Sequence, residues 1–132
     1  MRTALLSLVA LLALCGGAPA QGIGPQQFFC NKSVNGAAAV GTTQVVAPNA
    51  SMAVTYCGFE VTAAAAATFQ IITGAGATCG TNTLNITAAY DLGALGSLTG
   101  TSRQVSGPQG AGMCVVVTGT GPAHYTVYYS QQ

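Results

Sequence analysis

The run Met-Cys-Val-Val-Val at residues 113–117 is apolar throughout and has no polar residue that would mark a solvated face. A strand with one solvated face alternates apolar and polar residues, whereas an unbroken apolar run is typical of a strand covered on both faces. The same run would promote aggregation if it were exposed to water. It therefore predicts a central strand of a packed sheet, over about residues 113–120.

The following segment, residues 123–130, alternates instead. Tyr125, Val127 and Tyr129 fall on one face of a strand, and Tyr128 falls on the other face with Ser130. Because tyrosines occupy both faces, we expect at least one of them to be partly exposed.

Short alternating runs, broken by Gly, Asn and Pro, continue toward the N-terminus at intervals typical of a sandwich or barrel. With the two strands above we expect about eight; the other six are 28–32, 36–40, 42–47, 51–62, 68–73 and 84–90. Loops rich in small residues are expected at 74–80, 93–100 and 106–112. The alanine pentad 63–67 is too short to nucleate a helix and is expected to be a close-packed turn or one helical turn. The predicted fold is an all-β antiparallel sandwich of jelly-roll or Ig-like type.

Five cysteines are present, and four of them lie beyond the N-terminal segment, at Cys30, Cys57, Cys79 and Cys114. If the chain is exported, an even set at wide spacing predicts two disulfides, but the sequence leaves all three pairings open. A four-thiolate zinc site usually places its ligands in close pairs, which this spacing lacks. We therefore expect the disulfides to stabilise the sandwich.

Residues 1–20 have the pattern of a signal peptide. Arg2 precedes an apolar stretch at 4–14, and the small residues at 18–20 predict cleavage between Ala20 and Gln21. The apolar stretch is shorter than the roughly 20 residues that a membrane-spanning helix needs, which argues against a retained anchor. We expect no membrane span after cleavage.

Lipoprotein processing at Cys15 is a further alternative, although Leu14 stands where a small residue is expected. The predicted organisation is a signal peptide at 1–20, a flexible lead-in at 21–27 and a β-sandwich domain at 28–132. The corresponding location is secreted, periplasmic or at the cell surface.

Charged side chains are scarce. Beyond residue 20 they are Lys32, Glu60, Asp91 and Arg103, with His124 as the sole histidine. We expect no nucleic-acid binding, because such binding depends on many Lys and Arg side chains that neutralise phosphates. A protein with so little charge has little electrostatic repulsion to keep copies apart, so association with itself or with a larger assembly is expected.

The candidate chemistry is equally sparse. Glu60 and Asp91 are the only two carboxylates that a glycosidase could use, and a Ser-His-Asp device would need His124 and Asp91 to meet. The segment Gly-Ala-Gly-Ala-Thr-Cys at 74–79 has a cysteine where the dinucleotide-binding fingerprint has its third glycine. We expect no catalytic residue, no cofactor and no metal site.

Several short motifs carry a resemblance: Tyr-Cys-Gly at 56–58, Gly-x-Gly-x-x-Cys-Gly-Thr at 74–81, Met-Cys at 113–114 and Tyr-Tyr-Ser-Gln at 128–131. In these the chain resembles small disulfide-containing β-sandwich proteins of phage-associated and bacterial secreted or surface type, most of them without an assigned activity. The resemblance implies a jelly-roll sandwich with a role on a virion or cell surface, and it carries over no catalytic residue. The signal peptide favours the secreted or surface role over the virion.

The function expected from these features is that of a secreted, non-enzymatic structural or adhesive surface protein. Its partner would be itself or a surface assembly. A glycan-binding module is the alternative, although the chain has no tryptophan, and a small secreted hydrolase comes third.

Overall fold

The computed structural model describes residues 30–132. The predicted signal peptide, its cleavage site at Ala20 and Gln21, Cys15 and the lead-in at 21–27 all lie outside the described residues. The nine strands of the described part are β1 (Lys32–Ala38), β2 (Gly41–Val46), β3 (Val54–Ala63), β4 (Ala67–Ala75), β5 (Thr81–Asn85), β6 (Tyr90–Leu92), β7 (Ser97–Ser106), β8 (Gly112–Gly119) and β9 (Ala123–Gln131).

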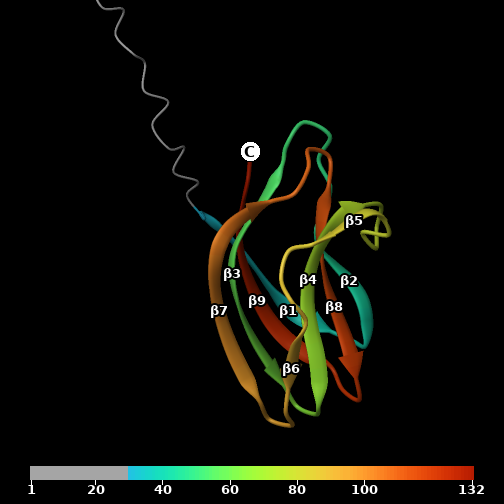
Figure 1. Ribbon diagram of the computed structural model, residues 1–132, viewed down its shortest axis with the longest axis vertical. Coiled ribbons are helices and arrows are strands. Elements are labelled where there is room, and N and C mark those ends of the chain that lie inside the picture. Colours follow the sequence, from blue (N-terminus) through green and yellow to red (C-terminus); the bar gives the residue numbers. More distant parts are fainter. Residues whose placement is uncertain (1–29) are drawn as a thin grey trace, which may run out of the picture.

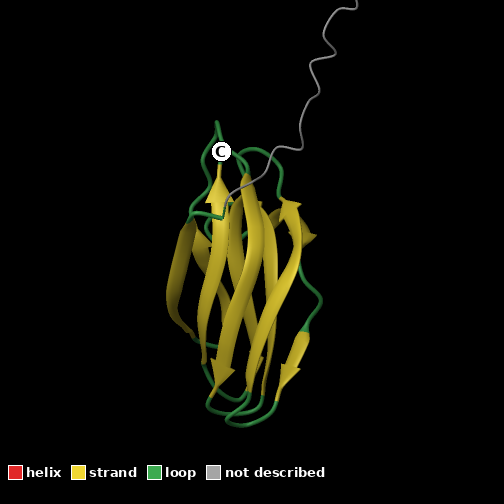
Figure 2. Cartoon of the chain, turned by 90° about the vertical axis from the view of Figure 1, so that its left-hand side faces the viewer, coloured by secondary structure: helices red, strands yellow, loops and turns green. Residues whose placement is uncertain are grey.

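The strands form two antiparallel sheets that pack face to face (Figure 1). One is four-stranded with the order β1-β9-β3-β7, and the other is five-stranded with the order β2-β8-β4-β5 and with β6 also paired to β4. Most consecutive strands lie in opposite sheets, which is the winding of a jelly roll. Figure 2 shows these strands running along the long axis, with no helix in residues 30–132. The predicted all-β sandwich is confirmed.

The run at 113–117 is the central strand that the sequence predicts. It lies in β8, between β2 and β4, and Met113, Val115 and Val117 point into the core between the sheets. Cys114 and Val116 point the other way, into a second apolar cluster on the outer face. Both faces of β8 are therefore covered.

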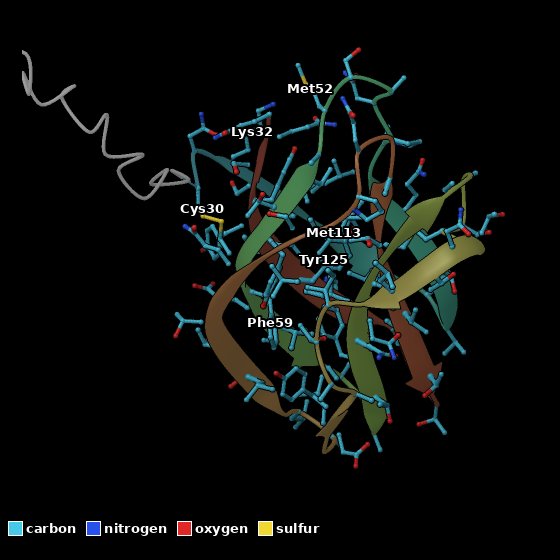
Figure 3. The ribbon with its side chains drawn as sticks, turned by 45° about the horizontal axis from the view of Figure 1, so that its top comes forward. Cys30, Lys32, Met52, Phe59, Met113 and Tyr125 are labelled. Carbon is cyan, nitrogen blue, oxygen red and sulfur yellow. A yellow bond between two sulfur atoms is a disulfide. The ribbon has the colours of Figure 1, made fainter. Side chains whose placement is uncertain are left out.

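Aromatic rings pack against one another in the core between the sheets. Phe59 lies 5.4 Å from Phe69 and 5.3 Å from Tyr90 between ring centroids, in tilted arrangements that favour aromatic pairs. Figure 3 shows Phe59, Met113 and Tyr125 between the two layers. Gly100 on β7 lies against the ring of Phe59, and a Cβ at this position would collide with it.

The four cysteines form the two disulfides that the sequence predicts, and the pairing is Cys30–Cys57 and Cys79–Cys114. The Cα atoms are 6.1 and 6.2 Å apart, within the normal range. Cys79 lies in the loop that joins β4 to β5 and Cys114 lies in β8, and both are fully buried in the second cluster. Cys30, by contrast, is exposed and fastens the start of the described chain to β3 (Figure 3).

The N-terminal strands differ from the prediction. Within the described residues, the two strands expected at 28–32 and 36–40 are one strand, β1. Gly36 was expected to begin a new strand, but it lies in the middle of β1, where a Cβ would come within 2.9 Å of the Tyr125 hydroxyl. The glycine is required by close packing and does not mark a turn.

Strand β7 was not predicted: a loop was expected over its first four residues, and no strand over the rest. The strand reads Ser-Leu-Thr-Gly-Thr-Ser-Arg-Gln-Val-Ser, and only Leu98 and Val105 provide apolar side chains. Its Gly100 resembles a loop residue in the sequence, but it is a strand residue that makes room for Phe59. The contact that explains this glycine lies on another strand, so local pattern could not reveal it.

The strand expected at 84–90 is broken into β5 and β6. The interruption follows from Thr87, whose hydroxyl accepts the backbone N–H of Ile71 at 3.0 Å. The backbone N–H groups of Ile86 and Thr87 both donate to the carbonyl oxygen of Ile71. The Thr87 hydroxyl thus takes the place of a backbone acceptor in the pairing with β4. Strand β5 ends at Asn85, just before this point.

The alanine pentad forms no helix. Its ends belong to β3 and β4, and residues 64–66 form the bend between the two sheets, as the close-packed turn that was expected. Gly119, with a φ of 117°, packs on this bend, and a Cβ there would contact the carbonyl oxygen of Ala66. Small side chains are what allow the two sheets to approach here.

Tyr56 provides a first testable prediction. Its side chain is fully buried, and its hydroxyl has no hydrogen-bond partner among the described residues. Burial, with a smaller contribution from Tyr90, raises the pKa of Tyr56 far above that of a free tyrosine. The folded protein therefore disfavours the ionised form of Tyr56. The stability that the neutral Tyr56 provides is fully present below about pH 10, the pKa of a free tyrosine, and is lost as the pH rises above that value.

We expect Tyr56→Phe to keep the ring in the core while removing the unsatisfied hydroxyl. The variant should be more stable than the parent by about 1 kcal/mol at neutral pH, because a buried unpaired hydroxyl costs roughly 1–3 kcal/mol. Its stability should also fall less steeply above pH 10. Urea unfolding at neutral and alkaline pH measures both effects, and a clear loss of stability at neutral pH would mean that the hydroxyl is hydrogen-bonded after all.

Candidate functional site

A shallow groove of about 240 Å³ runs over the outer face of the four-stranded sheet. The backbone register places Glu60 of β3 between Thr126 of β9 and Thr99 of β7. In the adjacent row, Thr62 lies between His124 and Ser97. We call this feature the Glu60 groove; its polar lining residues are Glu60, Thr62, Ser97, Thr99, His124 and Thr126.

Tyr128 borders this groove one row further along β9. Its hydroxyl donates a hydrogen bond to Oε1 of Glu60 at 3.1 Å. That bond, with smaller contributions from desolvation and from the negative charge of Glu60, raises the pKa of Tyr128 above its ordinary value. Tyr128 is 36% exposed. The prediction that one tyrosine of the last strand is partly exposed is therefore confirmed.

The remaining polar groups of the groove are available to a ligand. Within residues 30–132, neither Oε2 of Glu60 nor the side chains of Thr62, Thr99 and His124 have a hydrogen-bond partner. Glu60, Thr62, Thr99 and His124 are all exposed. The groove thus offers a carboxylate acceptor, an imidazole and several hydroxyls on one nearly flat surface.

Asp91 lies elsewhere. It belongs to β6 of the five-stranded sheet, and its Oδ1 accepts a hydrogen bond from the Thr68 hydroxyl at 2.9 Å. It lines a separate depression of about 390 Å³, together with small residues of the β3–β4 and β8–β9 turns. The structure therefore does not bring Glu60 and Asp91 together as a carboxylate pair, and it does not bring Asp91 to His124. It does bring His124 and Glu60 into one groove.

No group of three or more His, Cys, Asp and Glu side chains in residues 30–132 could hold a metal ion. Residues 30–132 also contain no helix with the length and apolar character needed to cross a membrane.

The sequence indicated part of this groove. Alternation along the third strand places Glu60 and Thr62 on the same face, opposite Phe59 and Val61, as the structure has them. Ser97 and Thr99 were missed because β7 was missed. A hydroxyl at every second position from Ser97 to Thr101 was the signal that could have located them.

Comparison with known proteins adds little to this picture. No family model matches the chain, and no curated protein matches it. Among solved structures, the chain is similar to one described as the crystal structure of PirA, with a TM-score of 0.35 and 17% sequence identity, over 75% of this chain and 90% of that one. A similarity this weak assigns neither family nor function to the chain.

Proposed function

We propose that this protein is an exported, non-enzymatic structural or adhesive module that associates with copies of itself through the first half of β7, residues 97–101. The observation that carries the proposal is the position of β7 at the end of the four-stranded sheet, where β3 is the one strand of residues 30–132 that pairs with it. An edge strand presents unpaired N–H and C=O groups to any strand that can approach.

The first half of β7 is suited to such pairing. Residues 97–101, Ser-Leu-Thr-Gly-Thr, contain no charge and no proline, the two features with which proteins usually protect an edge. A register shift follows, between the pairs Tyr56–Val105 and Gly58–Thr101, so the regular edge ends after Thr101. A second copy of β7 could add antiparallel to this segment around a two-fold axis and extend the sheet.

The low charge of the domain supports the same proposal. The charged side chains beyond residue 20 balance to zero, and a protein of near-zero net charge has little repulsion to oppose association. Two disulfides in a domain of this size are typical of oxidising compartments, which supports export to the periplasm, the cell surface or the medium. The separation of Asp91 from both Glu60 and His124 supports a non-enzymatic role, since the devices considered for hydrolysis need these groups together.

Sedimentation velocity over a range of protein concentrations tests the association. We expect the oxidised protein to form a dimer, and Thr101→Lys to weaken that dimer at least about tenfold, or about 1.4 kcal/mol, because a lysine on the edge opposes strand addition. Thr118→Lys is the matched control, because it adds the same charge at an exposed position of β8, away from β7. A parent protein that stays monomeric at the highest concentration would refute the proposal, as would equal effects of the two lysines.

A further inference from the structure

We infer that the Glu60 groove is a carbohydrate-binding site that takes one neutral sugar unit of a glycan. The inference rests on the groove alone and does not depend on association through β7. Three properties of the groove lead to it: the hydrogen-bonding groups it offers, its charge and its size.

The hydrogen-bonding groups match a polyol. A sugar presents several hydroxyls, each of which both donates and accepts, so its ideal surface mixes acceptors with groups that do both. Oε2 of Glu60 is an unused carboxylate acceptor, and hydrogen bonds to an ionised acceptor are the stronger kind. Thr62, Thr99 and Thr126 add hydroxyls around it, and His124 adds a ring nitrogen.

The charge of the groove selects against other ligands. Among the side chains that the structure describes, the lining contains one carboxylate and neither lysine nor arginine. A phosphate, a sulfate or an acidic sugar would meet the like charge of Glu60, with no cation among the described lining residues to offset it. A metal ion would find too few ligands, since His124 and Glu60 are the only groups of the lining that commonly bind metals. A neutral sugar meets neither obstacle.

The size and shape of the groove fit one sugar ring. Its volume of about 240 Å³ lies just below the roughly 300 Å³ at which sites for larger ligands begin, and it opens onto a flat sheet. Tyr128 is an exposed residue beside the groove, and its hydroxyl is bonded to Glu60, so it supplies an aromatic side chain on which a sugar ring can pack. Such an open site implies weak binding, with a Kd in the millimolar range.

The experiment is a titration of the oxidised, ¹⁵N-labelled protein with glucose, galactose, mannose, N-acetylglucosamine and, separately, inorganic phosphate, followed by two-dimensional NMR. At least one sugar is expected to shift the amide signals of β3, β7 and β9 that line the groove. Phosphate is expected to leave them unchanged. No shift with any sugar at millimolar concentration, or a groove response to phosphate alone, would overturn the inference.

Variants separate a specific site from a general response. Glu60→Gln keeps the shape of the side chain but loses its charge, and His124→Ala removes the ring nitrogen. Each should weaken sugar binding at least about tenfold. Asp91→Asn is the matched control, since it neutralises an exposed carboxylate on the other sheet, and it should bind as the parent does. Equal binding by all three variants would overturn the inference.

The two proposals fail separately. Thr101 lies on β7 but outside the lining of the groove, so Thr101→Lys should lose association and still bind the sugar. Loss of sugar binding in this variant alone would show that the site forms only between copies, and it would overturn the claim that the groove of one chain suffices.

Discussion

Replacing both Cys79 and Cys114 by alanine is expected to lower the free energy of unfolding by about 4 kcal/mol. A bridge that closes 35 residues restricts the unfolded chain by about that amount in the chain-entropy model. The total stability of a small domain is typically only about 5–15 kcal/mol, so the variant should be near the limit of folding at 37 °C. Urea unfolding of the double variant, compared with the oxidised parent, measures the loss.

The other disulfide provides the comparison. Its separation of 27 residues against 35 changes the entropic contribution by only about 0.2 kcal/mol. Any larger difference between the two double alanine variants therefore reports the packing of Cys79 and Cys114 in their buried cluster.

Accessibility also differs between the bridges, and graded reduction should reveal it. Because Cys30 is exposed while Cys79 and Cys114 are fully buried, alkylation and mass spectrometry should find Cys30 and Cys57 labelled first. Labelling of Cys79 and Cys114 first would contradict the assignment of the buried bridge.

Phe59→Ala is expected to destabilise the domain by about 3–5 kcal/mol, the usual cost of truncating a fully buried phenylalanine. Phe59 contacts Phe69 and Tyr90 of the five-stranded sheet and lies against Gly100 of β7. Loss of its ring therefore opens a cavity between the two sheets. The measurement is again urea unfolding of the oxidised protein.

Leu95→Ala is the matched control, because Leu95 is 87% exposed in the loop before β7 and its truncation should cost less than about 0.5 kcal/mol. A loss below about 1 kcal/mol for Phe59→Ala would mean that the core is not packed around this ring.

The sequence predicted the class of fold well because the relevant signals are local. The apolar run at 113–117 indicates burial on both faces without reference to any partner, and the alternation at 123–130 indicates a half-exposed strand. Both are confirmed. The signals that failed depend on partners far along the chain: Gly36 is explained by Tyr125, Gly100 by Phe59, and the break after Asn85 by the bond between Thr87 and Ile71.

Disulfide pairing was beyond the sequence for a similar reason. Four cysteines allow three pairings, and the choice depends on which loops the jelly-roll winding brings together. The loop between β4 and β5 folds back over β8, so Cys79 meets Cys114. Nothing near either cysteine encodes that path.

The candidate site was predictable in part. Alternation placed Glu60 and Thr62 on one face, but which strands flank β3 follows only from the sheet order β1-β9-β3-β7. That order brings His124 to Thr62 and places Asp91 on the opposite sheet. With so few ionisable residues, the sequence alone could not show which of them lie close together. The order of the strands in the sheet determines that.

The pairing of β1 with β9 has a consequence for how the domain is made. Lys32 lies opposite Tyr129, so the first described strand finds its partner only after every other described strand has been synthesised. Loop-closure entropy makes such distant pairings slow, and chains dominated by them fold in milliseconds to seconds. A ribosome adds roughly 5–20 residues per second, so β1 waits several seconds for β9 to emerge. Until then the four-stranded sheet cannot be completed, because β9 is the strand that joins β1 to β3.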